Sequence, residues 1–305
     1  MKRVISLLAC TTEMLFCLGR EDWLVGRSHE CDYPEQAHSL PVVTRANIIS
    51  GTSSEIHNDL RERQANGLSL YDVDETLLSE LKPDLLLTQD QCAVCAVTPQ
   101  DVERAACNIV GQKTEVLAIK PFTLQDVWDE FLRVAVSVDA VERAEVLLSQ
   151  WQSRLKDIPQ PKNPPRVLVL EWLEPLMGCG YWTPELVGLA GGTEVLGQSG
   201  DHAQWLTLEQ MVELEPDVVV LAPCGLKLGE IMEEAKRLDA FQSWSSVKAV
   251  RDNRVYAVDG NFYLSRSGPR LVESAEILGH IIRDQQSSGD GWLRLIPLEQ
   301  SESEA

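Results

Sequence analysis

The chain has 305 residues, a length that favours two domains with cores large enough to need no crosslinks. Its 47 acidic residues outnumber its 27 basic ones and give a formal net charge of −20 at pH 7. A surface of that sign repels phosphate backbones and anionic lipid, which argues against nucleic-acid binding and against adsorption to membranes. No run approaches the roughly 18 apolar residues of a membrane-spanning helix, so no membrane insertion is predicted.

The N-terminus predicts a strand followed by a helix rather than an export signal. The apolar run over residues 4–9 is shorter than the roughly 7 to 15 residues of a signal-peptide core. The next segment has the pattern of a helix with Thr11 or Thr12 as N-cap and Gly19 as the stop. Eight cysteines are too few for a disulfide scaffold in a chain of this length. We therefore predict a cytoplasmic protein, or a periplasmic one if the coding start lies upstream of Met1.

Six short apolar runs have the length and continuity of parallel strands that are buried on both faces. Helical patterns alternate with these runs along the chain, so the predicted fold class is α/β. The runs cover residues 4–8, 85–88, 116–119, 167–170, 218–221 and 255–258.

Two stretches of the first half of the chain return in the second half. Residues 11–22 resemble residues 183–194, and residues 71–89 resemble residues 204–223. Both members of the second pair place a Pro-Asp dipeptide directly before a buried strand. A twofold repeat of this length predicts two similar lobes rather than a solenoid of many units.

A linker separates the two repeats. Apolar side chains recur at helical spacing in it and predict one stiff helix over residues 139–157, which the proline-rich residues 159–165 end. We predict two Rossmann-like lobes joined by this single long linker helix, with a ligand cleft between the carboxyl ends of their strands. The predicted domains are an N-terminal α/β lobe over 1–122, the linker helix and Pro-rich connector over 123–165, a C-terminal α/β lobe over 166–290, and an acidic tail over 291–305.

Thiols and an imidazole follow two predicted strands of the first lobe. His29 and Cys31 lie in one loop, and Cys92 and Cys95 form a C-x-x-C in another. Thiolate and imidazole ligands suit zinc, and these four side chains predict a tetrahedral zinc or iron site. Two alternatives stay open: reduced thiols that pack as small apolar groups, and a redox-active C-x-x-C.

The loops of the second lobe are rich in aromatic residues for a chain that is only 6% aromatic. Trp and Tyr offer a large apolar face with a polar tip, which suits a broad, flat, amphipathic ligand. Trp172 and Trp182 have the alternative of belonging to the core. No nucleophile elbow, P-loop or dinucleotide fingerprint is present, so no enzyme is predicted. The residues in these loops are Trp172, Met177, Tyr181, Trp182, Trp205, Phe262 and Tyr263.

Four stretches carry a resemblance to a known family: DYPEQA at 32–37, LKPDLLL at 81–87, QWLTLEQM at 204–211 and SRSGPRLV at 265–272. With them the chain resembles the helical-backbone class of ABC-importer substrate-binding proteins. Among these it looks most like the vitamin B12 (cobalamin) binding proteins. The similarity extends from residue 3 to about residue 283, and the chain resembles a branch of the class that lacks the export signal and carries cysteines.

The resemblance implies roles for individual residues. Tyr33 and Trp205 are expected to face a corrinoid, while Asp259 and Arg266 meet its polar edge. One acidic residue on each lobe, Glu75 and Glu209 at matching positions of the repeat, is expected to dock on an ABC permease. The implied function is non-enzymatic binding of cobalamin, another corrinoid, or a related tetrapyrrole or metal chelate.

Two other functions stay open from the sequence. The first is a metal-site protein or metalloenzyme that uses Cys31, Cys92, Cys95 and His29, in which a thiolate or the imidazole ligates zinc or iron. The second is a cytosolic sensor or interaction protein that keeps the binding-protein fold.

Overall fold

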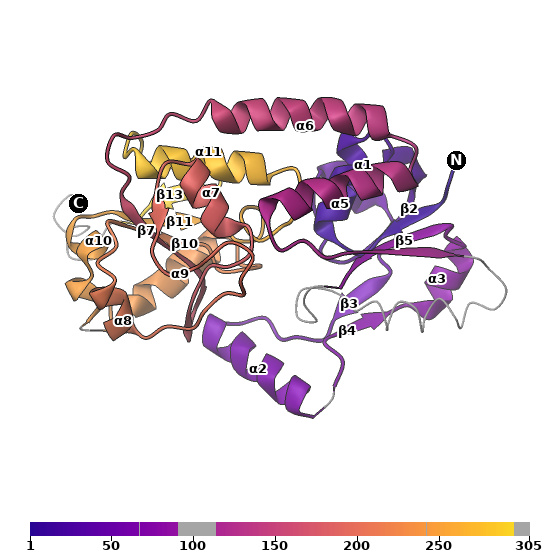
Figure 1. The fold of residues 1–305 in the computed structure, drawn as a ribbon. Helices are drawn as coiled ribbons and strands as arrows, with labels where there is room; N and C mark the ends of the chain where they lie inside the picture. The colour runs from indigo at the N-terminus through magenta and orange to yellow at the C-terminus, as the bar shows by residue number, and fades with distance from the viewer. Residues whose placement is uncertain (67, 91–113, 242, 296–305) are drawn as a thin grey trace. The chain divides into compact units, whose positions relative to one another are not determined.

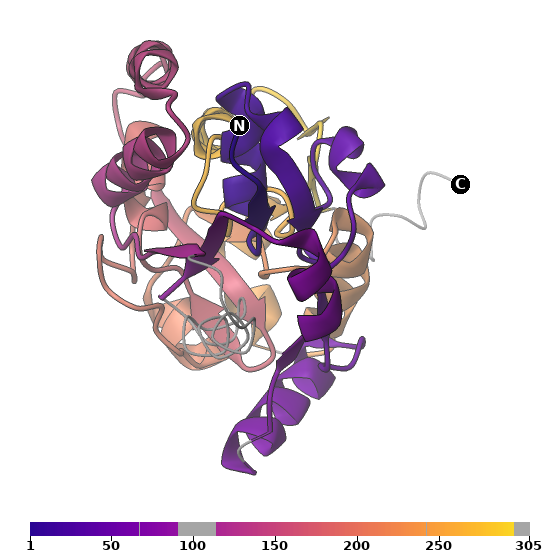
Figure 2. The ribbon, with the colours of Figure 1, turned by 90° about the vertical axis from the view of Figure 1, so that its right-hand side faces the viewer.

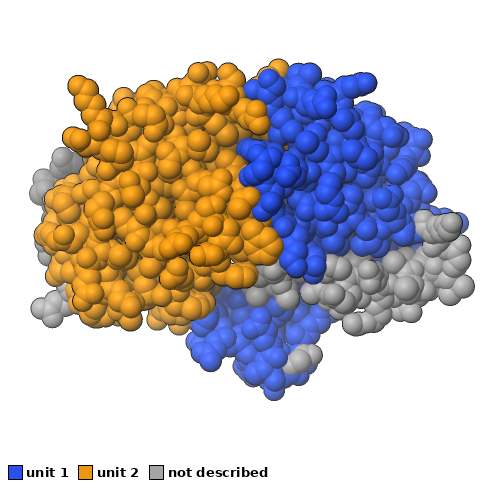
Figure 3. Space-filling view, in the orientation of Figure 1, with its two compact units in different colours: residues 1–51, 55–121, 125–149 blue, residues 52–54, 122–124, 150–305 orange. Residues whose placement is uncertain are grey.

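The computed structural model describes residues 1–66, 68–90, 114–241 and 243–295 (Figure 1). The chain divides into two compact units, coloured separately in Figure 3. Unit 1 comprises residues 1–51, 55–121 and 125–149, and unit 2 comprises residues 52–54, 122–124 and 150–305. Each unit has its own sheet with parallel central strands and helices around it, which confirms the predicted α/β class.

The sheet of unit 1 has four parallel strands in the order β2-β1-β5-β6. The strands are β1 (Val4–Ser6), β2 (Leu24–Arg27), β5 (Leu85–Gln89) and β6 (Glu115–Ile119). Two short strands, β3 (Thr44–Ala46) and β4 (Tyr71–Val73), form a separate antiparallel pair. The helix α2 (Ser53–Ala65) stands apart from the four-stranded sheet in both views (Figure 1, Figure 2).

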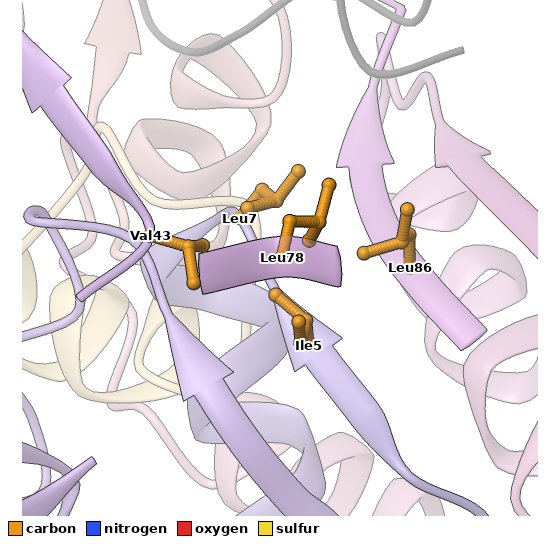
Figure 4. Packing of buried hydrophobic residues seen from close by; sticks show 5 residues of the cluster. All are labelled: Ile5, Leu7, Val43, Leu78 and Leu86. Carbon is orange, nitrogen blue, oxygen red and sulfur yellow. The ribbon is translucent and has the colours of Figure 1, made fainter. Parts of the chain in front are cut away.

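The core of unit 1 forms where α3 (Glu75–Leu81) covers the sheet. Each of its five central side chains is at most 2% exposed, and Figure 4 shows them converging from different elements. Burying an aliphatic side chain of this size stabilises the fold by about 1.5–3 kcal/mol. These side chains are Ile5, Leu7, Val43, Leu78 and Leu86.

The first helix begins earlier than the sequence predicts. The helix α1 spans Ala9–Cys17, and Leu8 is its N-cap residue without a side-chain cap. Thr11 and Thr12 are buried, and both hydroxyls hydrogen-bond the Ser6 hydroxyl, at 2.7 and 2.8 Å. Their oxygens tie the helix to β1 instead of capping it, so the predicted N-cap was wrong. The predicted stop is confirmed, because Gly19 has a φ of 66° just after the helix.

The linker region contains two helices. The helix α5 spans Leu124–Ser137 and α6 spans Val141–Lys156, separated by a turn in which Asp139 has a φ of 53°. Only α6 corresponds to the helix predicted over residues 139–157. The division between the compact units falls inside α6, after residue 149, whereas the predicted lobes ended at residue 122 and began at residue 166.

The sheet of unit 2 has a parallel centre flanked by antiparallel strands, in the order β12-β13-β11-β10-β7-β8, with β9 also paired to β7. Its strands are β7 (Arg166–Leu173), β8 (Leu176–Gly178), β9 (Thr193–Glu194), β10 (Val218–Leu221), β11 (Val255–Val258), β12 (Ser288–Gly289) and β13 (Trp292–Arg294). Its main helices are α7 (Thr183–Leu189), α8 (Leu208–Glu213), α9 (Leu228–Leu238), α10 (Lys248–Arg251) and α11 (Leu271–Ile282).

The predicted acidic tail over residues 291–305 contains a strand. The strand β13 pairs antiparallel with β11, and its Trp292 is 3% exposed. Burial of this large apolar side chain holds the segment on the sheet, so this part of the tail prediction was wrong. Residues 296–305 lie outside the described residues.

The two units repeat the same local structure before their Pro-Asp strands. The residue before each Pro-Asp pair is left-handed, with φ values of 46° and 44°. The Asp84 carboxylate accepts the Arg3 backbone N–H at 2.7 Å, and the Asp217 carboxylate accepts the Arg166 backbone N–H at 2.8 Å. The repeat found in the sequence is therefore a repeat of hydrogen bonds as well. In the described ranges, no helix is long and apolar enough to cross a membrane.

Candidate ligand-binding site

A small antiparallel ribbon at one edge of unit 2 carries a partly exposed row that includes two tryptophans. In the strand register, Trp172 of β7 lies opposite Met177 of β8, and Met177 lies opposite Trp205. Directly opposed residues of antiparallel strands have their side chains on the same face. The three side chains therefore form one row, which we call the Trp–Met–Trp row. Trp205 is 55% exposed, and the other two are half-buried.

The opposite face of the same ribbon is apolar and covered. Leu173 and Leu176 pair across β7 and β8, and the Leu206 N–H donates to the Leu176 carbonyl at 3.1 Å. These three leucines, together with residues of α9, line a cavity of about 220 Å³. Burial of this face fixes the register of the ribbon, because a slip by one residue would exchange the two faces.

The segment that carries Trp205 is held against the start of α7. The Tyr181 N–H donates to the Asp201 carbonyl at 2.7 Å, and the Tyr181 hydroxyl lies 2.7 Å from His202 Nδ1. A Cβ at Gly180 would lie within 3.0 Å of backbone atoms of residues 201–203. Only glycine allows this close approach of two chain segments.

A buried acidic cluster lies behind these loops. Glu171, the residue before Trp172, accepts the Thr183 hydroxyl at 3.0 Å, and Glu194 accepts the Leu196 N–H at 2.6 Å. Burial raises the pKa of each of the two carboxyls to about 7, and it raises the pKa of the nearby Cys179 thiol well above its usual range. Among the described residues, no cation contributes to any of these shifts. The cluster therefore changes its charge near neutral pH.

No motif in the sequence singles out this cluster. Its only local sign is a glutamate that directly follows an apolar strand run, and Glu171 has that position. The partners come from β9, from the loop before α7 and from Thr183 at the start of α7, and no local pattern joins them to Glu171.

Trp172 and Trp182, each predicted either to contact the ligand or to belong to the core, have different environments. Trp182 is 5% exposed and donates its indole N–H to the Leu264 carbonyl at 2.7 Å, which places it in the core of unit 2. The indole nitrogen of Trp172 is buried and has no hydrogen-bond partner in the described part of the chain. The position of Trp172 is therefore set by strand register and packing.

The loop after β11 is organised by a buried carboxylate. Asp259 accepts the backbone N–H groups of Asn261 and Phe262 at 3.1 and 3.0 Å, and that of Leu228 at 3.2 Å. These bonds shape the loop that presents Arg266, which donates to the Asn261 side-chain oxygen at 3.0 Å. A contact of Asp259 or Arg266 with a ligand stays a prediction.

Two guanidinium groups lie on one aromatic ring in this loop. Arg266 and Arg270 lie 5.4 and 4.6 Å from the ring centroid of Phe262, within the range of a cation–π interaction. Phe262 is half-buried. Arg270 is 8% exposed, so its guanidinium group packs inside unit 2 and helps to hold the loop around Phe262.

In unit 1, the predicted ligand residue Tyr33 is 45% exposed and precedes a cis peptide bond to Pro34. His29 is nearby in sequence, and its Nδ1 lies 2.7 Å from the Thr44 hydroxyl, within hydrogen-bond distance. Its Nε2 lies 3.2 Å from a carboxylate oxygen of Glu30 but is buried without a hydrogen-bond partner in the described part of the chain. Tyr33 is thus accessible to a ligand, whereas both ring nitrogens of His29 already have neighbours.

Cys31 is fully buried, with its sulfur 3.4 Å from the Ser28 hydroxyl and 3.7 Å from the Ser6 carbonyl. This is the packing expected of a small neutral thiol. Cys92 and Cys95 lie outside the described residues. The residues that are described contain no group of three or more His, Cys, Asp or Glu side chains arranged to hold a metal ion. The zinc or iron site stays a prediction.

The two glutamates predicted to dock on a permease are exposed in the first turns of α3 and α8. Each helix has a side-chain N-cap, Asp74 in one and Thr207 in the other. When these caps are aligned, Glu75 is the first residue of its helix and Glu209 the second. The two glutamates therefore occupy neighbouring positions of the repeat, not the matching positions that we expected.

The chain is similar to several known proteins. The ABC transporter substrate-binding lipoprotein YvrC of Bacillus subtilis is 24% identical to this chain. The alignment covers 92% of this chain and 80% of the lipoprotein. A vitamin B12-binding protein of Vibrio cholerae is 22% identical, and the alignment covers 90% of this chain and 87% of that protein. The structure of a periplasmic heme-binding protein from Pseudomonas aeruginosa superposes with a TM-score of 0.71 at 17% identity. The superposition covers 95% of this chain and 96% of that protein.

These comparisons confirm the resemblance to substrate-binding proteins of ABC transporters. The profile described as periplasmic binding protein matches residues 4–261. Because that match spans most of the sequence, the chain belongs to the periplasmic binding protein family.

Proposed function

We propose that this protein binds a corrinoid or a related tetrapyrrole as the substrate-binding component of an ABC importer, with cobalamin as the first ligand to test. Membership of the periplasmic binding protein family, and a relative named as an ABC transporter substrate-binding lipoprotein, support a non-enzymatic role with a small-molecule ligand and a permease partner. Relatives named as vitamin B12-binding proteins, and a structural neighbour named as a heme-binding protein, support a large macrocyclic ligand.

The observation that carries the proposal is the Trp–Met–Trp row. Its side chains are apolar over most of their surface, and Trp205 at its end is 55% exposed. Isolated apolar side chains are common on surfaces, but a row of large ones that ends in an exposed tryptophan points to an interaction site. Indole rings stack on flat conjugated systems, so the row suits the face of a macrocycle better than a sugar or an amino acid.

Titration of the purified protein with cyanocobalamin and with hemin tests the proposal. We expect a change in ligand absorption and a measurable heat at micromolar ligand with at least one of the two. Trp205→Ala should weaken binding about 10-fold to 100-fold, the usual effect of removing a central aromatic contact. The matched control is Trp23→Ala, since Trp23 is a half-buried tryptophan of unit 1. Absence of both signals with both ligands would refute the proposal.

Docking on the permease is proposed for Glu75 and Glu209. Both carboxylates are exposed at helix N-termini. The pKa of Glu209 is lowered by its backbone N–H and by the Thr207 hydroxyl, which keeps it anionic at neutral pH. Exposed acidic groups of this kind steer a protein toward basic surfaces on a partner.

A further inference from the structure

The centre of the Trp–Met–Trp row is a methionine, and its position is fixed by two independent strand pairings. Met177 is opposite Trp172 on one side and opposite Trp205 on the other. Neighbouring strands lie about 4.8 Å apart, so the backbones that bear the two indoles are about 10 Å apart. A rigid ligand that contacts both indoles from above must cover Met177.

The ribbon holds this residue in place. The neighbouring residues Leu176 and Gly178 are buried, and the Gly178 N–H donates to the Gln204 carbonyl at 2.8 Å. The methionine side chain itself is half-buried and has three rotatable bonds. The backbone is therefore fixed while the thioether adapts to the surface above it.

The chemistry of Met177 selects among ligands. A thioether is polarizable, makes favourable contacts with aromatic rings, and is at best a weak hydrogen-bond acceptor. A ligand with hydroxyl groups at its centre would lose their hydration without a replacement partner. A planar conjugated ring system loses nothing there and gains contact with all three side chains.

We infer that Met177 is a specificity-determining residue of the ligand site, and that the Trp–Met–Trp row receives one face of a planar conjugated macrocycle through apolar contact. This inference rests on the proposed function and narrows it. Contact through the face of the ring does not require a metal at its centre, so metal-free protoporphyrin IX should bind as well as, or within about tenfold of, hemin.

The experiment compares wild type, Met177→Glu, Met177→Leu and Met232→Glu by fluorescence quenching with protoporphyrin IX and with hemin. We expect Met177→Glu to weaken both affinities at least tenfold, because a carboxylate under the ring is desolvated without a partner. Met177→Leu keeps the apolar volume and should therefore keep most of the wild-type affinity. Met232, on α9 and 38% exposed, lies outside the row, so Met232→Glu should bind as wild type does.

The outcomes separate the two proposals. If wild type binds none of hemin, cobalamin and protoporphyrin IX, the proposed function fails and the inference fails with it. If wild type binds cobalamin but neither hemin nor protoporphyrin IX, or if Met177→Glu and Met232→Glu have equal affinities for the ligands that bind, only the inference fails. If hemin binds and protoporphyrin IX binds more than about a hundredfold more weakly, the metal rather than the ring face carries recognition, and the inference is again refuted. Equal thermal unfolding midpoints of the two glutamate variants show that loss of binding is not loss of fold.

Discussion

Glu171 makes the stability of unit 2 depend on pH in a direction that can be measured. Burial raises its pKa from the ordinary value of 4.5 to about 7. The folded protein therefore holds this proton more tightly than the unfolded chain does. The resulting stabilisation is fully present below about pH 4.5 and is lost as the pH rises through about 7.

The size of the effect follows from the shift. One pKa unit corresponds to about 1.4 kcal/mol, so the shift of Glu171 contributes about 3 kcal/mol. Wild type should lose about that much unfolding free energy between about pH 4.5 and about pH 8 through this group alone. Glu194 has a pKa raised in the same way and adds to the slope.

The perturbation is Glu171→Gln, which has no proton to lose over this range. Its amide oxygen can still accept the Thr183 hydroxyl that now bonds the carboxyl at 3.0 Å. Urea unfolding followed by tryptophan fluorescence from about pH 4.5 to about pH 8.5 should give the variant a shallower loss of stability than wild type. Glu174→Gln, which changes an exposed glutamate nearby, should leave the slope unchanged. Equal slopes for Glu171→Gln and wild type would refute the reasoning.

Two further predictions concern the partner surface and the backbone. The double reversal Glu75→Lys and Glu209→Lys should reduce ligand-dependent stimulation of the permease ATPase at least tenfold and leave the ligand Kd unchanged; an unchanged ATPase response would contradict docking through these residues. Gly180→Ala should destabilise the protein by about 1–3 kcal/mol because its Cβ meets backbone atoms. Gly188→Ala, inside α7 with no atom within 4 Å of its Cβ, should stabilise by up to about 1 kcal/mol, so similar unfolding midpoints for the two would contradict the packing argument.

The central strands could be predicted from the sequence because their signal is local. A strand buried on both faces must be apolar at every position, so β10 and β11 appear in the sequence with the bounds that they have in the structure. The repeated Pro-Asp segments were visible for the same reason. In each copy the end of the helix, the proline and the aspartate lie within a few residues of the strand that follows. The sequence therefore predicts both strand starts.

The first helix shows where local signals mislead. Thr11 and Thr12 have the chemistry of N-cap residues, but their hydroxyls are buried and bonded to Ser6 of β1. A residue caps a helix only if its side-chain oxygen accepts one of the free N–H groups of the first turn. Packing of α1 against the sheet directs both threonine hydroxyls to Ser6 instead.

The sequence by itself determined the α/β class, the twofold repeat and the aromatic character of the loops in unit 2. Only the tertiary structure decided which of those aromatics form a surface: it buries Trp182, leaves Trp205 exposed, and places Met177 between Trp172 and Trp205. Strand β8 has three residues, too few to show a period of two, and its register depends on which face is buried against α9. The physical reason is that strand pairing and burial join residues that are far apart in sequence, and no local pattern records those contacts.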